Sequence, residues 1–211
     1  MVVKPSMTAL EMTSKILQEK CISVEAGLVL HEAVIGGALQ RPIHHSELVL
    51  DVALKWGSWG EEYRRDNYLL LKRSILHEEA VNYAHQTFSV FGEAFYSDLK
   101  SKTFKKHMLS MSNARLTINK SEDVELASWP IEEISWYLGC EPRRHPPHSL
   151  NMTFVHPRHE PVIRSKERPF FGRTISFESR EFYIKWIAAM LVAEFANDLT
   201  PSQEKLVPLL D

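Results

Sequence analysis

The sequence predicts a mainly α-helical fold, with a helical N-terminal domain dominated by one long helix and a smaller α+β C-terminal part. Between Glu61 and Leu99 the chain has neither proline nor a turn cluster, and only Gly92 interrupts the stretch. Apolar residues recur there at roughly the spacing of one helix face. After Ser101, strand-like and proline-rich segments replace that pattern. We therefore expect a helical domain over residues 1–112 and an α+β part over residues 113–211.

The other elements follow from local signals. In the N-terminal half, amphipathic spacing and cap residues predict helices at about 7–20, from Val24 to Gly36-Gly37, and from near Ser46. The later elements are expected as a strand over 114–119, a short helix after Pro130, strands over 150–155 and 161–163, a buried helix over 177–197 and a short helix after Thr200-Pro201.

Composition and charge limit the function classes. With 44% hydrophobic and 25% charged residues, the chain is ordinary for a globular protein. Its net charge of -2 is not that of a generic nucleic-acid coat. The charge is nevertheless segregated, because residues 100–173 carry 13 basic and 8 acidic side chains between acidic flanks. Two distant cysteines, Cys21 and Cys140, are expected to be free thiols. With neither a signal peptide nor a membrane span visible, we expect no membrane partner and a cytoplasmic or nuclear location.

Four histidines form the first candidate site. His145 and His148 enclose two prolines, and His156 and His159 follow with the same spacing. Polyproline II has three residues per turn, so residues three apart can point the same way. Neutral imidazoles suit zinc, copper or nickel. The alternative is a loop in which the four rings make ordinary hydrogen bonds.

Basic side chains form the second candidate site, in the His/Arg/Pro-rich segment 141–173 and at a cluster near residue 100. Such side chains neutralise phosphates or acidic surfaces, and nearby rings can stack on bases. Pairing with the protein's own carboxylates is the alternative, and the helix dipole could explain the earlier cluster. The candidates are Lys102, Lys105, Lys106, Arg143, Arg144, Arg158, Arg164, Lys166, Arg168 and Arg173, and the earlier cluster also contains Lys100 and His107.

A third constellation joins His45 to the pair His77-Glu78, 32 residues further on. The arrangement resembles the HD-domain phosphohydrolases, in which histidines and a His-Asp pair bind a metal that activates water. Glu78 stands where that family has Asp. The resemblance implies a metal-dependent hydrolase with His45, His77 and Glu78 as metal ligands.

Other enzyme signatures are missing: the sequence has no Gly-rich phosphate loop, no GxSxG elbow and no HExxH. We therefore expect a non-enzymatic regulatory or adaptor protein. It would form homo-oligomers through its helices and bind RNA or an acidic protein partner through the basic segment. The alternatives are the HD-like hydrolase and a structural subunit of a larger assembly. No cofactor is expected, with zinc at the late histidines as the one candidate.

Overall fold

The computed structural model describes residues 3–23, 28–84, 89–121, 124–156, 169–196 and 198–199. The chain divides into two compact units. Unit 1 is the described part of residues 1–79 together with residues 198 and 199, and unit 2 runs from Ala80 to Ala196. This division differs from the boundary expected after residue 112. Ten strands lie in the described part of the chain, so the expectation of a mainly α-helical fold is wrong.

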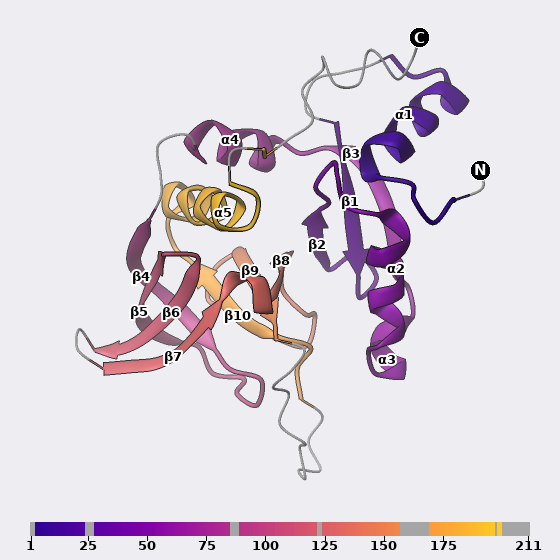
Figure 1. Cartoon of the computed structure of the whole chain (residues 1–211). Helices are drawn as coiled ribbons and strands as arrows, with labels where there is room; N and C mark the ends of the chain where they lie inside the picture. Colours follow the sequence, from indigo (N-terminus) through magenta and orange to yellow (C-terminus); the bar gives the residue numbers. More distant parts are fainter. Residues whose placement is uncertain are drawn as a thin grey trace. The chain divides into compact units, whose positions relative to one another are not determined.

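Unit 1 combines a small antiparallel sheet with helices (Figure 1). Strand β1 is central and pairs on one side with β2 and on the other with β3. In chain order the elements are α1 (Ala9–Lys20), β1 (Leu28–Val34), β2 (Leu39–Pro42), α2 (Val49–Gly57), α3 (Glu61–Arg64), β3 (Tyr68–Arg73) and the start of α4 (Ile75–Ala84).

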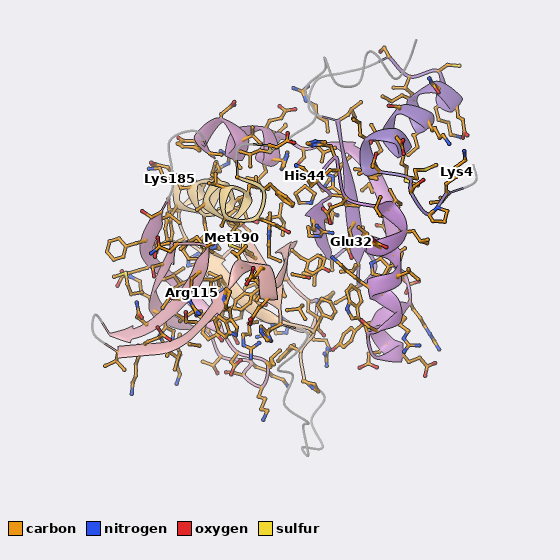
Figure 2. The ribbon with its side chains drawn as sticks, viewed as in Figure 1. Lys4, Glu32, His44, Arg115, Lys185 and Met190 are labelled. Atoms are coloured by element: carbon orange, nitrogen blue, oxygen red, sulfur yellow. The ribbon has the colours of Figure 1, made fainter. Side chains whose placement is uncertain are left out.

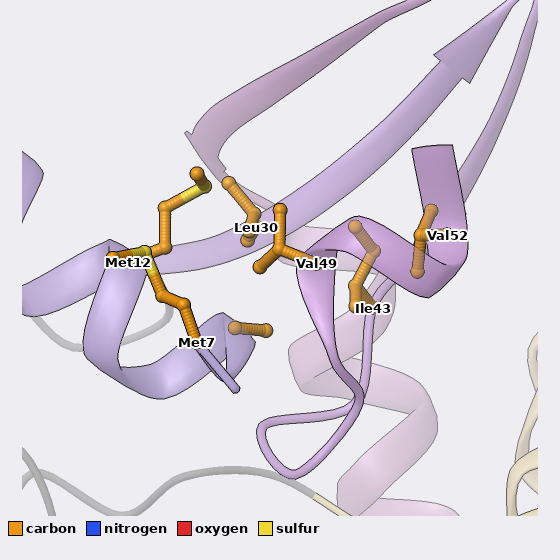
Figure 3. Packing of buried hydrophobic residues seen from close by; sticks show 7 residues of the cluster. Met7, Met12, Leu30, Ile43, Val49 and Val52 are labelled. Carbon is orange, nitrogen blue, oxygen red and sulfur yellow. The ribbon is translucent and has the colours of Figure 1, made fainter. Parts of the chain in front are cut away.

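Helix α1 begins at a capping box. The Thr8 hydroxyl accepts from the Glu11 amide, and the Glu11 carboxylate accepts from the Thr8 amide. Apolar side chains of α1, β1 and α2 then form one buried cluster, shown in Figure 3. Removing this surface from water is the main stabilising contribution to unit 1. The cluster consists of Met7, Ala9, Met12, Leu30, Ile43, Val49 and Val52, with Ile16, Leu69 and Leu71 packed against it.

Unit 2 is built on a strongly bent antiparallel sheet with the strand order β8-β9-β10-β4-β5-β6-β7. The bend brings β7 against β9, since the rings of Trp129 and Phe154 lie 5.0 Å apart. The strands are β4 (Val90–Ser97), β5 (Lys105–Ser112), β6 (Arg115–Ser121), β7 (Val124–Pro130), β8 (Ser135–Gly139), β9 (Leu150–Val155) and β10 (Arg173–Phe177), with the 3-10 helix η1 (Ile131–Glu133) between β7 and β8.

Helix α5 (Arg180–Phe195) packs against β4, β5, β10 and η1 and completes the core of unit 2 (Figure 1). The Ser179 hydroxyl caps its N-terminus by accepting from the Phe182 amide. The helix buries one side of an aromatic group in which Phe177 contacts Phe182, Tyr183 and Trp186. The sequence predicted α5, β6 and β9 at nearly these positions.

The expected long helix over 61–99 does not exist. That stretch contains α3, β3, α4 and β4 instead. Asp66 has φ of 60°, a left-handed conformation that no α-helix contains, and it reverses the chain before β3. The helix expected from Val24 to Gly36 is replaced by β1 over the described residues. The basis for self-association along a long helix is thereby removed.

Candidate functional site

The described late histidines lie at opposite ends of β9. His145 is exposed and His148 packs on the ring of Phe95 at 5.3 Å, both before the strand. His156 follows the strand, is buried, and its Nε2 lies 3.0 Å from Glu133 Oε2. A strand of this length separates its ends by roughly 20 Å. The structure therefore does not bring His148 and His156 together, and His159 lies outside the described residues.

Of the expected partner-binding arginines of unit 2, Arg144 is buried. Arg144 is 3% exposed, and its guanidinium donates to Ser97 Oγ at 2.7 Å and to the carbonyl oxygens of Ser101, Asp98 and Gly172 at 3.0, 3.0 and 2.8 Å. Its guanidinium also stacks on the ring of Phe170, 3.9 Å from the centroid. Arg144 thus positions the connection between β4 and β5 and offers nothing to a partner.

Two further arginines are paired within the chain. Arg143 forms an ion pair with the buried carboxylate of Glu141 and donates to the Pro169 carbonyl at 3.0 Å. Arg173 is paired with Asp98 at 3.1 Å, and its guanidinium lies over the ring of Trp129. The alternative interpretation, in which basic residues pair with the protein's own carboxylates, holds for both. The remaining candidates Arg158, Arg164, Lys166 and Arg168 lie outside the described residues.

Unlike Arg144, the lysines near residue 100 are exposed to solvent. All four are exposed on the connection between β4 and β5 and at the start of β5. We call Lys100, Lys102, Lys105 and Lys106 the lysine cluster. Only Lys106 has a carboxylate partner among the described residues, Glu93 at 2.5 Å, and both side chains are half exposed. The sequence placed these residues at a helix end, but the structure places them on a loop and a strand.

The loop that carries the lysine cluster is fixed by hydrogen bonds. Ser97 Oγ donates to the Ser101 carbonyl at 2.7 Å, and the Thr103 amide donates to Ser101 Oγ at 3.1 Å. The Leu99 amide donates to Asp98 Oδ1 at 2.8 Å. The loop backbone is held by these hydrogen bonds and by Arg144, which donates to the carbonyls of Asp98 and Ser101. The exposed ammonium groups therefore project from a preorganised segment.

The side chains beneath this loop, Tyr96, Asp98, His107 and Arg173, interact with one another. The Tyr96 hydroxyl contacts Asp98, and the Tyr96 ring packs edge-on against His107 at 6.0 Å. Burial and the Asp98 charge raise the pKa of Tyr96, so its hydroxyl stays neutral at physiological pH. Arg173 also forms an ion pair with Asp98. The free positive charge of this region therefore lies on the outer lysines.

Unit 1 contains a histidine cluster that sequence reasoning missed as a group. His44 and His45 lie on the turn after β2, and Asp198 lies beside them. One ligand atom from each of these three residues lies within 4.8 Å of the other two. Figure 2 labels His44 in the sheet-and-helix region of unit 1. The adjacent histidines were a visible signal, but nothing in the sequence indicates that Asp198 is their neighbour.

The three residues of the HD-like motif, His45, His77 and Glu78, do not come together as a group. His77 is 3% exposed on α4, and neither of its ring nitrogens has a hydrogen-bond partner. Burial lowers the pKa of His77 to about 4, against a smaller opposing effect from Glu78. Glu78 pairs with Arg73 at 3.1 Å, and His45 pairs with Asp198. The three residues of the motif therefore have separate partners or environments.

Comparison with known proteins gives the fold. No protein-family model matches the sequence. The crystal structure of the coiled-coil, RA and PH domains of Lamellipodin superposes with a TM-score of 0.74, at 12% identity, over 100% of this chain and 86% of that one. The fold is similar to that of an RA–PH pair.

Two weaker similarities accompany this one. The mouse protein "Arf-GAP with Rho-GAP domain, ANK repeat and PH domain-containing protein 2" is 24% identical over 212 residues, which is 96% of this chain. The chain spans only 12% of that protein's length. The solution structure of the PH domain of human pleckstrin homology domain-containing protein family A member 5 covers 54% of the chain at a TM-score of 0.37, too low to indicate a shared fold.

These findings correct the expected function. The comparisons give a PH- and RA-like β fold in place of the expected helical one, and they support neither RNA binding nor an HD-type phosphohydrolase. Both described cysteines are free, as expected. No helix in the described ranges is long and apolar enough to cross a membrane.

Proposed function

We propose that the chain is a binding module of an adaptor protein, and that unit 2 binds the anionic headgroups of phosphoinositides through the lysine cluster. The observation that carries the proposal is the exposure of Lys100, Lys102 and Lys105 without carboxylate partners among the described residues. PH and RA domains usually bind proteins or phosphoinositides, which makes a phosphorylated lipid the ligand to test first.

Charge and preorganisation both support this ligand. A phosphoinositide headgroup presents several phosphate charges within the width of one short loop, whereas a single anionic phosphatidylserine presents one. Each lysine near an anionic membrane surface contributes about 1 kcal/mol. The loop backbone is already held by Ser101 and Arg144, so less conformational entropy is lost when the headgroup binds.

Vesicle flotation of the full chain tests the proposal. Vesicles of phosphatidylcholine alone are compared with vesicles that contain a phosphatidylinositol bisphosphate or trisphosphate, and with phosphatidylserine vesicles of the same total charge. We expect binding to phosphoinositide vesicles, weaker binding to phosphatidylserine vesicles, and a decrease in affinity with increasing salt. Soluble inositol phosphates, added as competitors, separate headgroup recognition from attraction to the lipid surface.

A triple variant with Lys100→Ala, Lys102→Ala and Lys105→Ala is expected to bind about 100-fold more weakly, from about 1 kcal/mol for each lysine. The matched control changes three lysines of unit 1 to alanine: Lys4, Lys20 and Lys55. It removes the same charge and should bind as the wild type does. Equal losses in the two variants, or equal binding to phosphatidylserine vesicles, would contradict headgroup recognition by this loop.

A further inference from the structure

The turn after β2 brings three potential metal ligands together in unit 1. His45 Nε2 lies 3.1 Å from Asp198 Oδ2, and the rings of His44 and His45 have centroids 4.0 Å apart. His44 Nε2 is hydrogen-bonded to the Asp198 carbonyl oxygen. Two imidazoles therefore face both the carboxylate and the carbonyl of one aspartate.

This turn is braced by the surrounding structure. The His44 amide donates to Glu47 Oε2 at 2.8 Å, and the Glu47 amide donates to the His44 carbonyl at 3.0 Å. The Leu10 amide, in the first turn of α1, donates to the His45 carbonyl at 3.1 Å. Arg41 holds the Glu47 carboxylate with two nitrogens. The two histidines are thus presented by a backbone that cannot shift freely, as a preformed ligand site requires.

Ser46 orients the ring of His44. Its Nδ1 lies 2.7 Å from Ser46 Oγ. In the structure Nε2 donates to the Asp198 carbonyl and Nδ1 accepts from the Ser46 amide at 3.4 Å. Zinc bound at Nε2 would replace the first hydrogen bond and move the proton to Nδ1, which then donates to Ser46 Oγ. Metal-bound histidines almost always use their other ring nitrogen for such a hydrogen bond, which fixes the tautomer and the ring orientation.

The donor set selects the metal. Two imidazole nitrogens and one carboxylate oxygen suit Zn²⁺, whereas Ca²⁺ and Mg²⁺ prefer oxygen ligands alone. Ligand atoms within 4.8 Å of one another need only a small approach to reach Zn–N and Zn–O bonds of about 2 Å. The side chain of Asp198 is 55% exposed, which leaves a path for the ion to enter.

We propose that His44, His45 and Asp198 bind one Zn²⁺ ion in unit 1. The three protein ligands leave a fourth position. His77 lies close enough to His44 for their charges to interact, and its two buried ring nitrogens have no hydrogen-bond partner. Zinc would join the turn after β2 to the residues that follow α5 and so hold the ends of unit 1 together.

Zinc titration of the chelator-treated full chain, without a polyhistidine tag, tests the proposal by calorimetry. Co²⁺ serves as a second probe, because its visible absorption reports tetrahedral nitrogen and oxygen coordination. We expect one equivalent of Zn²⁺ to bind and a higher unfolding temperature in its presence. An Asp198→Asn or His45→Ala variant is expected to bind at least about 100-fold more weakly, since outer residues alone change metal affinity by up to that factor.

A His145→Ala variant is the matched control, because His145 is an exposed histidine of unit 2 and should leave the affinity unchanged. Circular dichroism of Asp198→Asn, whose side chain is exposed, shows whether the fold is kept. The proposal is overturned if the wild type binds no stoichiometric zinc. It is also overturned if Asp198→Asn and His45→Ala retain the affinity, which would mean that His45 and Asp198 form an ion pair only. Loss of binding in His145→Ala would place the metal on the late histidines instead.

Discussion

Arg41 Nε donates to Glu32 Oε2 at 3.0 Å, and both side chains are almost fully buried, with 5% and 1% of their surface exposed. The same guanidinium holds Glu47, and Trp56 Nε1 donates to the second oxygen of Glu32 at 2.6 Å. Figure 2 labels Glu32 in unit 1. Burial would raise the pKa of Glu47, but the Arg41 charge and hydrogen bonds outweigh it and lower that pKa. One arginine thus pairs with two carboxylates beside the turn that presents His44 and His45.

Replacing Arg41 by methionine is expected to lower the free energy of unfolding by about 3–5 kcal/mol, because the buried carboxylate of Glu32 would lose the cation with which it is paired. Urea unfolding measures the loss. The control is Arg65→Met, which breaks the Arg65–Glu61 pair, with 74% and 81% of the side chains exposed. That change should cost less than about 1 kcal/mol. Similar losses in both variants would show that the buried network contributes no more than a surface pair.

Replacing Arg144 by lysine keeps the positive charge but removes the planar fork that reaches Ser97 and three carbonyl oxygens. We expect faster amide hydrogen exchange over residues 98–103 and a vesicle affinity at least about 5-fold lower, because the loop loses its order before binding. Exchange measured by mass spectrometry reports the first effect. Unchanged exchange in this loop would show that Ser97 and Ser101 suffice to hold it.

The strands were hidden from sequence reasoning for identifiable reasons. β1 is buried on both faces, and its polar residues His31 and Glu32 are buried with the apolar ones. It therefore lacks the alternation that indicates a half-buried strand. In β4 two of the inward positions are the small residues Gly92 and Ala94. The alternation of large apolar and polar side chains that marks a strand is therefore weak there. The helices expected from Val24 to Gly36-Gly37 and over 61–99 resulted in part from these ambiguous patterns.

Elements with strong local signals were predicted well. α5 has a serine cap and a long apolar run, and β9 has a compact run bounded by turn residues. The lysine cluster could also be read from the sequence, since charge density does not depend on the fold. Which arginines are buried could not be read, because Arg144 has partners between 28 and 47 positions away. The proximity of Asp198 to His44 is likewise a tertiary fact, across 154 positions.

The stability of unit 1 is expected to fall in mild acid. Burial lowers the pKa of both His31 and His77 to about 4. His31 also faces Lys72, His77 and Arg41, while His77 faces Glu78 and His44. An unfolded histidine titrates near 6.5, so between about pH 6.5 and 4 the unfolded chain binds more protons than the folded one. Stability is therefore complete above that range and decreases through it as the pH falls.

Each of these two histidines contributes a slope of up to about 1.4 kcal/mol per pH unit. Urea unfolding at a series of pH values above about 5 measures this slope, since carboxylates such as Glu47 add their own acid dependence only below that range. His77→Leu should remove roughly half of the slope, while His145→Ala, an exposed residue, should leave it unchanged. A stability that is flat between pH 5 and 6.5 would show that water or a partner reaches these rings.

Gly172 leaves no space for a side chain. A Cβ atom there would lie 2.6 Å from the Phe154 carbonyl oxygen and 2.8 Å from Thr153 Cγ2. Because its own carbonyl accepts from Arg144, any shift also disturbs the loop that carries the lysine cluster. Gly172→Ala is expected to lower the free energy of unfolding by about 1–3 kcal/mol through steric overlap. Gly57→Ala on α2, where a Cβ meets nothing within 4 Å, should be neutral or stabilising. Thermal unfolding compares the two, and equal melting temperatures would mean that β9 can move aside without cost.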